Sequence, residues 1–262
     1  MWVTIPAYRE ESLIAASCEQ WLNAEGVEHV LIYISNEPWQ HLNPLPEYPD
    51  MTIKSDRTEE IIRTYFPEVE VVVHDLQTET LVRMQMLEKA KLAGTDYIVI
   101  ADVDEFYTKM DWHHIYAKTF SDPEFGVRCL MKTYYWDYLS RYEPIDSWTP
   151  IVIVKPGKAT FANRAPTPGL EKFVLAENYM HHLSWLGPAE RIRDKIVGHA
   201  HIGIINEEWR QYHLELKGRW LWDVNQWMYP GYHKTLVQDP VPAEIVNNIT
   251  RWQQKLGFYN EK

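Results

Sequence analysis

The chain has 262 residues, of which 45% are hydrophobic and 24% are charged, so it can form one large domain. Its formal net charge of −11 argues against a broad nucleic-acid-binding surface, which would be basic, although a local basic patch is compatible with it. The two cysteines, Cys18 and Cys129, exclude a disulfide framework or a thiolate metal site, and we expect a reducing compartment. We also expect a cytoplasmic location, without a secretory leader or a membrane span.

The first part of the chain alternates between strand and helix patterns. Apolar runs predict strands at residues 2–8, 27–35, 69–76 and 96–104. Helical spacing between them predicts helices at 10–25, 57–66 and 78–94, and a proline-rich loop is predicted at 36–51. In the helix at 78–94, we expect Leu81, Met84, Leu87 and Leu92 to face inward. This alternation predicts an α/β fold with a Rossmann-like, mostly parallel central sheet flanked by helices.

The pattern changes after residue 105. Longer strands are predicted at 125–139 and 149–157, with antiparallel or mixed pairing, and helices at 112–120, 189–198, 206–218 and 241–258. We expect a single domain with a nucleotide-facing half at 1–105, an acceptor half at 106–215 and a tryptophan-rich segment at 216–262. The chain has twelve tryptophans; core packing is the simpler explanation for each of them, and stacking on sugar rings or bases is the alternative.

Polar side chains follow three of the predicted strands. They lie at residues 8–11, at 35–39 and at 102–105, where Asp102, Asp104 and Glu105 come directly after a buried apolar run. The carboxyl ends of parallel strands meet at one edge of a sheet, and ligands bind there. Crowded carboxylates need a cation or hydrogen-bond donors. We therefore expect these loops to converge on one ligand site.

Three motifs resemble glycosyltransferases. "IPAYREE" after the first strand is similar to the opening of glycosyltransferase family 2, with Arg9 where many members have Asn. "ADVDEF" resembles the Asp-x-Asp signature of GT-A glycosyltransferases, in the form found in families 2, 17 and 92. "HHLSWLGPAERIRDKIVGHAH" resembles a downstream segment of family 17-like enzymes. The resemblance implies a GT-A fold and a transferase that uses a nucleotide-diphospho sugar, with UDP as the expected nucleotide.

The resemblance also implies a divalent metal, Mn²⁺ or Mg²⁺, both of which suit oxygen ligands. It makes Asp104 a metal ligand, Asp102 a ligand of the metal, of the donor ribose or of both, and His182 a further metal ligand. In an extended segment Asp102 and Asp104 would point to the same side while Val103 packs behind them. The alternatives are an acidic cluster that caps the next helix and a histidine that is simply part of the core.

Donor binding is assigned to residues from several segments. Pro6 lies at the end of the first strand, Tyr8 and Glu10 follow it, and Asn36, with Trp39, follows the second strand. The base and ribose of the donor would lie there. Lys195 is the candidate for the diphosphate, and His201, which shares an i, i+2 spacing with His199, can line the site.

Arg83 either faces the donor, as the resemblance implies, or pairs with Glu79 four residues earlier. Arg191 and Arg193 add positive charge or are solvated helix residues. The sequence has no glycine-rich phosphate loop.

The catalytic base is the least determined residue. An inverting transferase needs a carboxylate that deprotonates the acceptor hydroxyl. The candidates are Asp137, Asp146, Glu171 and Asp194, and their spacing selects none of them. We take Glu171, in the glycine- and proline-containing segment 163–173, as the first candidate and Asp194 as the second; Glu171 can equally pair with Lys172 or Arg164.

The partners implied are a nucleotide-sugar donor and an acceptor that is a glycan, a lipid-linked sugar, a protein or a modified nucleic-acid base. Two other functions stay open. One is a zinc hydrolase in which His181, His182, His199, His201 and the carboxylates hold Zn²⁺, although no HExxH spacing supports it. The other is a non-catalytic carbohydrate-binding protein that uses the tryptophans.

Overall fold

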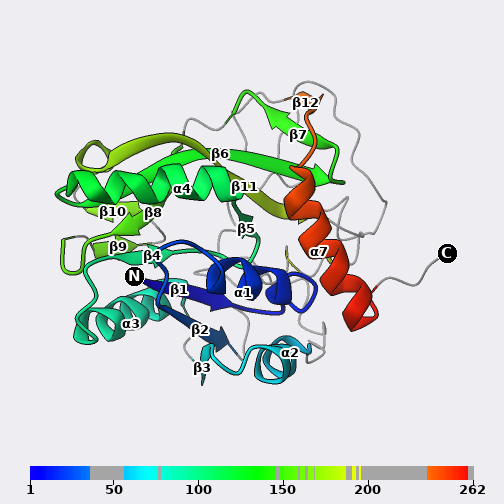
Figure 1. The fold of residues 1–262 in the computed structure, drawn as a ribbon, viewed down its shortest axis with the longest axis horizontal. Coiled ribbons are helices and arrows are strands. Elements are labelled where there is room, and N and C mark those ends of the chain that lie inside the picture. Colours follow the sequence, from blue (N-terminus) through cyan, green and yellow to red (C-terminus); the bar gives the residue numbers. More distant parts are fainter. Residues whose placement is uncertain are drawn as a thin grey trace, which may run out of the picture.

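The computed structural model describes residues 1–35, 56–75, 78–145, 148–158, 160–162, 165–167, 169–186, 191–192, 195 and 235–258. Its centre is a mixed sheet (Figure 1). One half consists of parallel strands in the order β4-β1-β2-β3. Their bounds are Ile98–Ile100 for β4, Trp2–Ala7 for β1, His29–Ser35 for β2 and Glu70–His74 for β3. This half confirms the predicted alternation, because strands β1 to β4 occur in the expected order.

The other half of the sheet is mixed. β8 (Ile151–Val154) is antiparallel to both β4 and β6 (Gly126–Trp136), and the long strand β11 (Val174–Leu186) runs parallel to β6. β7 (Ser140–Glu143) pairs with β6 and with β12 (Thr235–Gln238). β5 (Glu105–Phe106) pairs with β11, and β9 (Thr160–Ala162) and β10 (Ala165–Thr167) form a separate hairpin. The α/β class with a mixed second half is therefore confirmed.

Helices cover both faces of the parallel strands (Figure 1). α1 (Ile14–Leu22), α2 (Thr58–Tyr65), α4 (Lys109–Ala117) and α7 (Ala243–Leu256) contribute to the largest core cluster, and short 3₁₀ segments occur at Lys118–Ser121 and Leu170–Lys172. α3 (Glu79–Leu92) covers the opposite face. Residues of β2 alternate between these two layers, as strand geometry requires: Ile32 packs toward α1 and Tyr33 toward α3.

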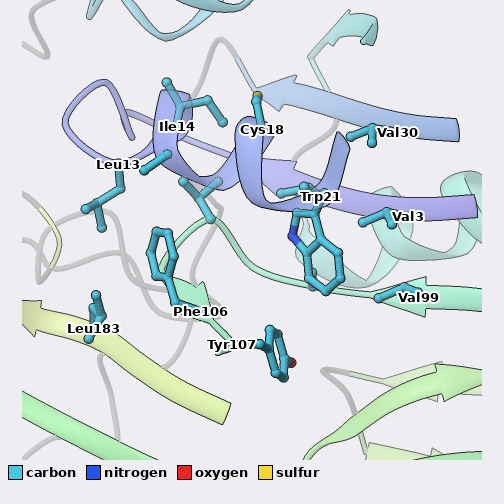
Figure 2. Close-up of a cluster of buried hydrophobic side chains, with 14 of the residues drawn as sticks. Val3, Leu13, Ile14, Cys18, Trp21, Val30, Val99, Phe106, Tyr107 and Leu183 are labelled. Carbon is cyan, nitrogen blue, oxygen red and sulfur yellow. The ribbon is translucent and has the colours of Figure 1, made fainter. Parts of the chain in front are cut away.

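Buried aromatic residues join α1 to the centre of the molecule. Trp21 is fully buried, and its ring lies 5.5 Å from that of Tyr107 and 4.9 Å from that of Trp112. Figure 2 shows Trp21 on α1 together with Phe106, Tyr107 and Leu183 from the β5 and β11 region. For Trp21, Trp112, Trp185 and Trp252, all of which are buried, core packing is thus confirmed.

The predicted inward face of α3 is wrong for Leu81, Met84 and Leu92, which are exposed. Leu87 is half-buried and packs against a core cluster, as expected. The residues that face the sheet are Val82, Arg83, Met86 and Ala90. The helix carries two apolar stripes, and the one that contains Val82, Met86 and Ala90 is buried. Among the described residues, no helix combines the length and the apolar character that a membrane crossing requires.

The predicted fourth strand is too long. β4 ends at Ile100, and residues 101–104 form a turn before β5. The Glu105 amide donates to the Asp102 carbonyl at 3.2 Å. Asp102 and Asp104 therefore do not project side by side from an extended strand. The buried side chain of Val103 does pack into the core, as expected.

Candidate active site

The pairing of β5 with β11 places two predicted metal ligands beside each other. His182 is opposite Glu105 in this ladder, and the Leu183 amide donates to the Asp104 carbonyl at 2.8 Å. His182 Nε2 lies 3.8 Å from Asp104 Oδ1. The short strand β5 thus connects the acidic turn after β4 to a strand from the second half of the chain. Asp104 and His182 meet although they are 78 positions apart, the difference between their residue numbers.

The acidic turn is held from two sides. Glu105 is 1% exposed, and its Oε2 accepts a hydrogen bond from the Asp102 amide at 2.9 Å. Gln20 of α1 donates to the Glu105 carbonyl at 3.2 Å and accepts from the Tyr107 amide at 2.8 Å. Gln20 therefore satisfies backbone groups of β5 as a neighbouring strand would. Its role was missed from the sequence, where a single polar residue beside Trp21 carries no distinct signal.

Asp104 is buried beside Lys195 and His182. Its side chain is 4% exposed; Lys195 Nζ donates to its Oδ2, and His182 faces its Oδ1. Burial alone would raise the pKa of Asp104, but Lys195, His182 and Arg191 outweigh burial and hold the pKa well below its usual range. Asp104 is therefore an anionic, cation-binding carboxylate.

Glu10 lies beside the same cations. It follows β1, and its carboxylate is 3.6 Å from Lys195 Nζ and 3.6 Å from Arg191 Nη2. Burial raises the pKa of Glu10, an effect that Lys195 and Arg191 partly offset and Asp104 reinforces. Lys195 in turn would lose basicity by burial, but Asp104 and Glu10 raise its pKa. The loops after β1 and β4 thus converge, and Lys195 and Arg191 lie between them. The third loop of the prediction, at 35–39, lies outside the described residues after Ser35.

The loop after β1 is fixed by backbone contacts. The Glu10 carbonyl accepts from the amides of Leu13 and Ile14 and begins α1, while the Glu10 amide donates to Thr58 Oγ1 at 3.0 Å. Arg9 has a φ of 54°, in the left-handed region. Asn tolerates this region better than Arg. The resemblance noted above places Asn at this position in many proteins, and the left-handed backbone is a physical reason for it.

Asp102 is engaged by Arg83. Arg83 Nη2 lies 2.6 Å from Asp102 Oδ1, and Arg83 Nε lies 2.7 Å from Glu79 Oε1. The Arg83 side chain is 4% exposed, whereas that of Asp102 is 31% exposed. Of the two roles left open for Arg83, pairing with Glu79 is therefore observed, and the same guanidinium also reaches the acidic turn.

His181 points away from His182, as expected for neighbours on a strand. His181 Nδ1 lies 3.0 Å from the Tyr134 hydroxyl, and His181 Nε2 lies 3.5 Å from Asp111 Oδ2. Asp111 also accepts from the Tyr179 amide at 3.2 Å. This buried network joins α4, β6 and β11, and it gives His181 a structural environment distinct from the Asp104 site.

The remaining predicted residues are placed as follows. Pro6 lies within β1 and pairs with Tyr33, and half-buried Tyr8 has the Arg9 guanidinium over its ring. Asp137 accepts from the amides of Leu139 and Ser140 in the β6–β7 turn, so it has a turn-forming role. The predicted residues that lie outside the described part of the chain are Asn36, Trp39, Asp146, Arg164, Arg193, Asp194, His199, His201, Trp220, Trp222 and Trp227.

Glu171 is not brought to this cluster. It is exposed and precedes β11, whose first residue is Val174. His182 lies eight positions after Val174 (182 − 174), which corresponds to roughly 25 Å of extended strand. The sequence could not reveal this separation, because it does not show that one continuous strand connects the two segments.

The site fits a divalent ion in part. Asp104 Oδ1 and His182 Nε2 lie 3.8 Å apart, and these two side chains are the ones that would hold a divalent ion. Carboxylate and imidazole are suitable ligands for Mn²⁺. Within the part of the chain that the structure describes, no group of three His, Cys, Asp or Glu side chains is arranged around one metal position. Asp102, the third predicted ligand, contacts Arg83 instead.

Comparisons with known proteins give only distant similarities. No protein-family model matches the sequence, and no curated protein matches it. A crystal structure of 4-diphosphocytidyl-2C-methyl-D-erythritol synthase is 16% identical, covers 68% of this chain and 89% of its own, and has a TM-score of 0.43. TarS of S. aureus (residues 1–349) in complex with UDP is 14% identical, covers 81% and 69%, and has a TM-score of 0.40.

Glucosyl-3-phosphoglycerate synthase from Mycobacterium tuberculosis, in complex with Mn²⁺, UDP and glucosyl-3-phosphoglycerate, is 16% identical. It covers 51% of this chain and 43% of its own, with a TM-score of 0.29. What this protein does must therefore be inferred from the residues of its own site.

Proposed function

We propose that this protein is a metal-dependent glycosyltransferase of the GT-A type. It transfers a sugar from a nucleotide-diphospho sugar, with UDP as the expected nucleotide, to an acceptor hydroxyl. One observation carries the proposal: buried Asp104 and the half-buried side chains of His182, Lys195 and Glu10 meet at the edge where the parallel strands end. Ligand sites of α/β sheets occur at this edge.

The charges of the site suit a diphosphate and a cation. Asp104 stays anionic and, with His182, would hold Mn²⁺ or Mg²⁺. Lys195 and Arg191 supply positive charge for phosphate oxygens. When bound, the metal supplies Lewis-acid stabilisation of the negative charge on a departing nucleoside diphosphate. Asp102, with the exposed part of its side chain, is proposed to contact the donor ribose or the metal.

Three residues proposed for the site lie outside the described part of the chain. Asn36, Asp194 and His201 are still proposed for the donor site or for catalysis on the sequence resemblance alone. Among the carboxylates considered as bases, Asp194 is now preferred to Glu171, because Asp194 adjoins Lys195 in the sequence and Lys195 lies in the site. The acceptor is a glycan, a lipid-linked sugar, a protein or a modified base, and the domain division at 105 and 215 is likewise proposed.

The test is calorimetric titration of UDP with and without Mn²⁺. The parent protein should bind UDP with Mn²⁺, and Asp104→Asn and His182→Ala should each weaken binding at least tenfold, about 1.4 kcal/mol. Asp122→Asn is the matched control, since Asp122 pairs with Lys155 and its side chain is 84% exposed. Thermal shift with UDP, GDP and their sugars extends the test, because ligand at ~100 times its Kd adds about 2.7 kcal/mol.

Other results would point to other functions. Tight Zn²⁺ binding with no nucleotide effect would favour the hydrolase. Glycan binding that needs neither metal nor Asp104 would favour the carbohydrate-binding protein. If UDP and GDP fail to bind in the presence of Mn²⁺, the transferase proposal is wrong.

A further inference from the structure

Lys195 is bound to the same carboxylate that would hold the metal. Its Nζ donates to Asp104 Oδ2 and lies 3.6 Å from Glu10 Oε1. The Lys195 side chain is 18% exposed and that of Asp104 is 4% exposed, so water screens this pair poorly. The ammonium group of Lys195 therefore offsets negative charge of Asp104 and Glu10 in the site.

The neighbouring cation is held differently. Arg191 Nη1 donates to the carbonyls of Ser184 at 3.0 Å and Leu186 at 2.6 Å, which fixes its guanidinium to the end of β11. Within the described part of the chain, the partners of Lys195 are carboxylates only, Asp104 and Glu10. Lysine has a flexible four-carbon stem and a compact charge. Of the two cations, Lys195 is thus the one that can exchange partners without disturbing β11.

A divalent ion on Asp104 would meet the positive charge of Lys195. Like charges that share one poorly screened carboxylate repel each other, so metal binding in the presence of this ion pair is weakened. A diphosphate changes the balance, because its oxygens offer Lys195 another anionic partner. Once Lys195 moves to the phosphate, the full charge of Asp104 is available to the metal.

We propose that Lys195 acts as an internal competitor that makes divalent-metal binding at Asp104 conditional on a bound diphosphate. This inference rests on the proposed function and adds its regulation. Coupling between two ligands is reciprocal, so the metal strengthens diphosphate binding by the same factor. The protein would then load metal and donor together, and free metal alone would bind weakly.

The test measures Mn²⁺ affinity without nucleotide, by electron paramagnetic resonance of free Mn²⁺, and again with saturating UDP. In the parent protein, UDP should tighten Mn²⁺ binding at least tenfold. Lys195→Gln should tighten Mn²⁺ binding without UDP by tenfold or more, about 1.4 kcal/mol, and should reduce the effect of UDP. Lys195→Arg, which keeps the charge, should leave Mn²⁺ binding weak without UDP. Lys155→Gln, in the exposed pair with Asp122, is the neutral control.

A lysine that only binds phosphate would behave differently: its removal would weaken UDP binding and leave Mn²⁺ binding without UDP unchanged. That result overturns the competition while the proposed function stands. Failure of the parent protein to bind UDP with Mn²⁺ overturns both. If Lys195→Gln does not fold, Lys195→Met, which removes the same charge and keeps much of the side-chain volume, should show the same tighter Mn²⁺ binding; unchanged or weaker binding overturns the inference.

Discussion

Arg83 on α3 and Asp102 in the acidic turn form an ion pair of 2.6 Å, and this pair attaches the turn to the helix behind it. The same guanidinium binds Glu79, so a single buried cation serves two carboxylates. Asp102 and Asp104 are thereby turned toward different partners, Arg83 and Lys195. The pair explains why two aspartates with one residue between them do not act as a simple clamp in this structure.

Loss of Arg83 should strongly destabilise the protein. Arg83→Met removes a 4% exposed cation and leaves Glu79 and Asp102 without it. Because Glu79 and Asp102 are 17% and 31% exposed, water screens the two carboxylates in part, and we expect a cost of about 1–3 kcal/mol. Urea unfolding of the variant measures this cost.

The control is Arg63→Met. Arg63 pairs with Glu59 with the same i, i+4 spacing and the same 2.7 Å distance, but its side chain is 56% exposed. Exposed pairs contribute about 0.5 kcal/mol or less. If both variants lose the same stability, burial of the Arg83 pair does not explain its effect.

The Asp111 carboxylate should make stability depend on pH. Burial alone would raise its pKa, but hydrogen bonds from His181, Thr108 and the Tyr179 amide lower the pKa below its usual range. The unfolded chain therefore binds this proton at higher pH, near ~3.9. The contribution is fully present above ~3.9 and is lost as pH falls through the lower folded-state pKa.

Asp111→Asn should thus be less stable than the parent protein at pH 7, and the difference should shrink below about pH 4. Denaturant unfolding of both proteins from pH 7 to pH 3 tests this. A stability difference that stays constant over that range would show that ionisation of Asp111 is not involved.

α7 should contribute much of the stability of the first half. Its residues Ile245, Ile249, Trp252 and Leu256 are buried in the large core cluster, and Trp252 lies 5.0 Å from the ring of Phe66. Ile249→Ala should cost about 2–5 kcal/mol. Asn247→Ala, at an exposed position of the same helix, should stay within about 0.5 kcal/mol of the parent.

The same contacts predict the effect of a deletion. Removing residues 219–262 takes away α7 and β12 and should give an insoluble or much less stable protein. Solubility and thermal melting of the truncated chain measure this. Unchanged melting would show that α7 is dispensable.

Arg9 occupies an unfavourable backbone conformation. Its φ of 54° costs a residue with a β-carbon roughly 1 kcal/mol. Arg9→Asn should therefore raise the free energy of unfolding by up to about 1 kcal/mol, because Asn adopts this region more readily. The urea midpoint is the measurement. A lower midpoint would mean that the contact of Arg9 with the Tyr8 ring outweighs the backbone cost.

The order of the strands and helices in the first part of the chain could be predicted from local sequence patterns. Strand β1 and the inward face of α1 with Ile14, Cys18 and Trp21 occur where the sequence predicts them, and α4 begins three residues before the predicted start at Trp112. These patterns suffice to predict the elements, because a helix that is buried on one side has apolar residues at regular spacing, and a fully buried strand is a continuous apolar run.

Local patterns did not predict which face of α3 is buried against the sheet. Leu81 and Met84 look like core residues, yet Val82 and Arg83 face the sheet. The spacing of apolar residues allows either stripe to be buried. The choice depends on the shape of the sheet surface and on an ion-pair partner, Asp102, that belongs to another element.

The site shows the same division. Charged residues after buried strands make Asp104 and Glu10 candidates for a ligand site, whereas the resemblance to glycosyltransferases makes His182 and Lys195 candidates. Only the tertiary structure decides that β5 pairs with β11, which brings His182 to Asp104 and keeps Glu171 at the far end of the strand. Strand pairing between distant segments depends on long-range packing, which leaves no fixed spacing in the sequence.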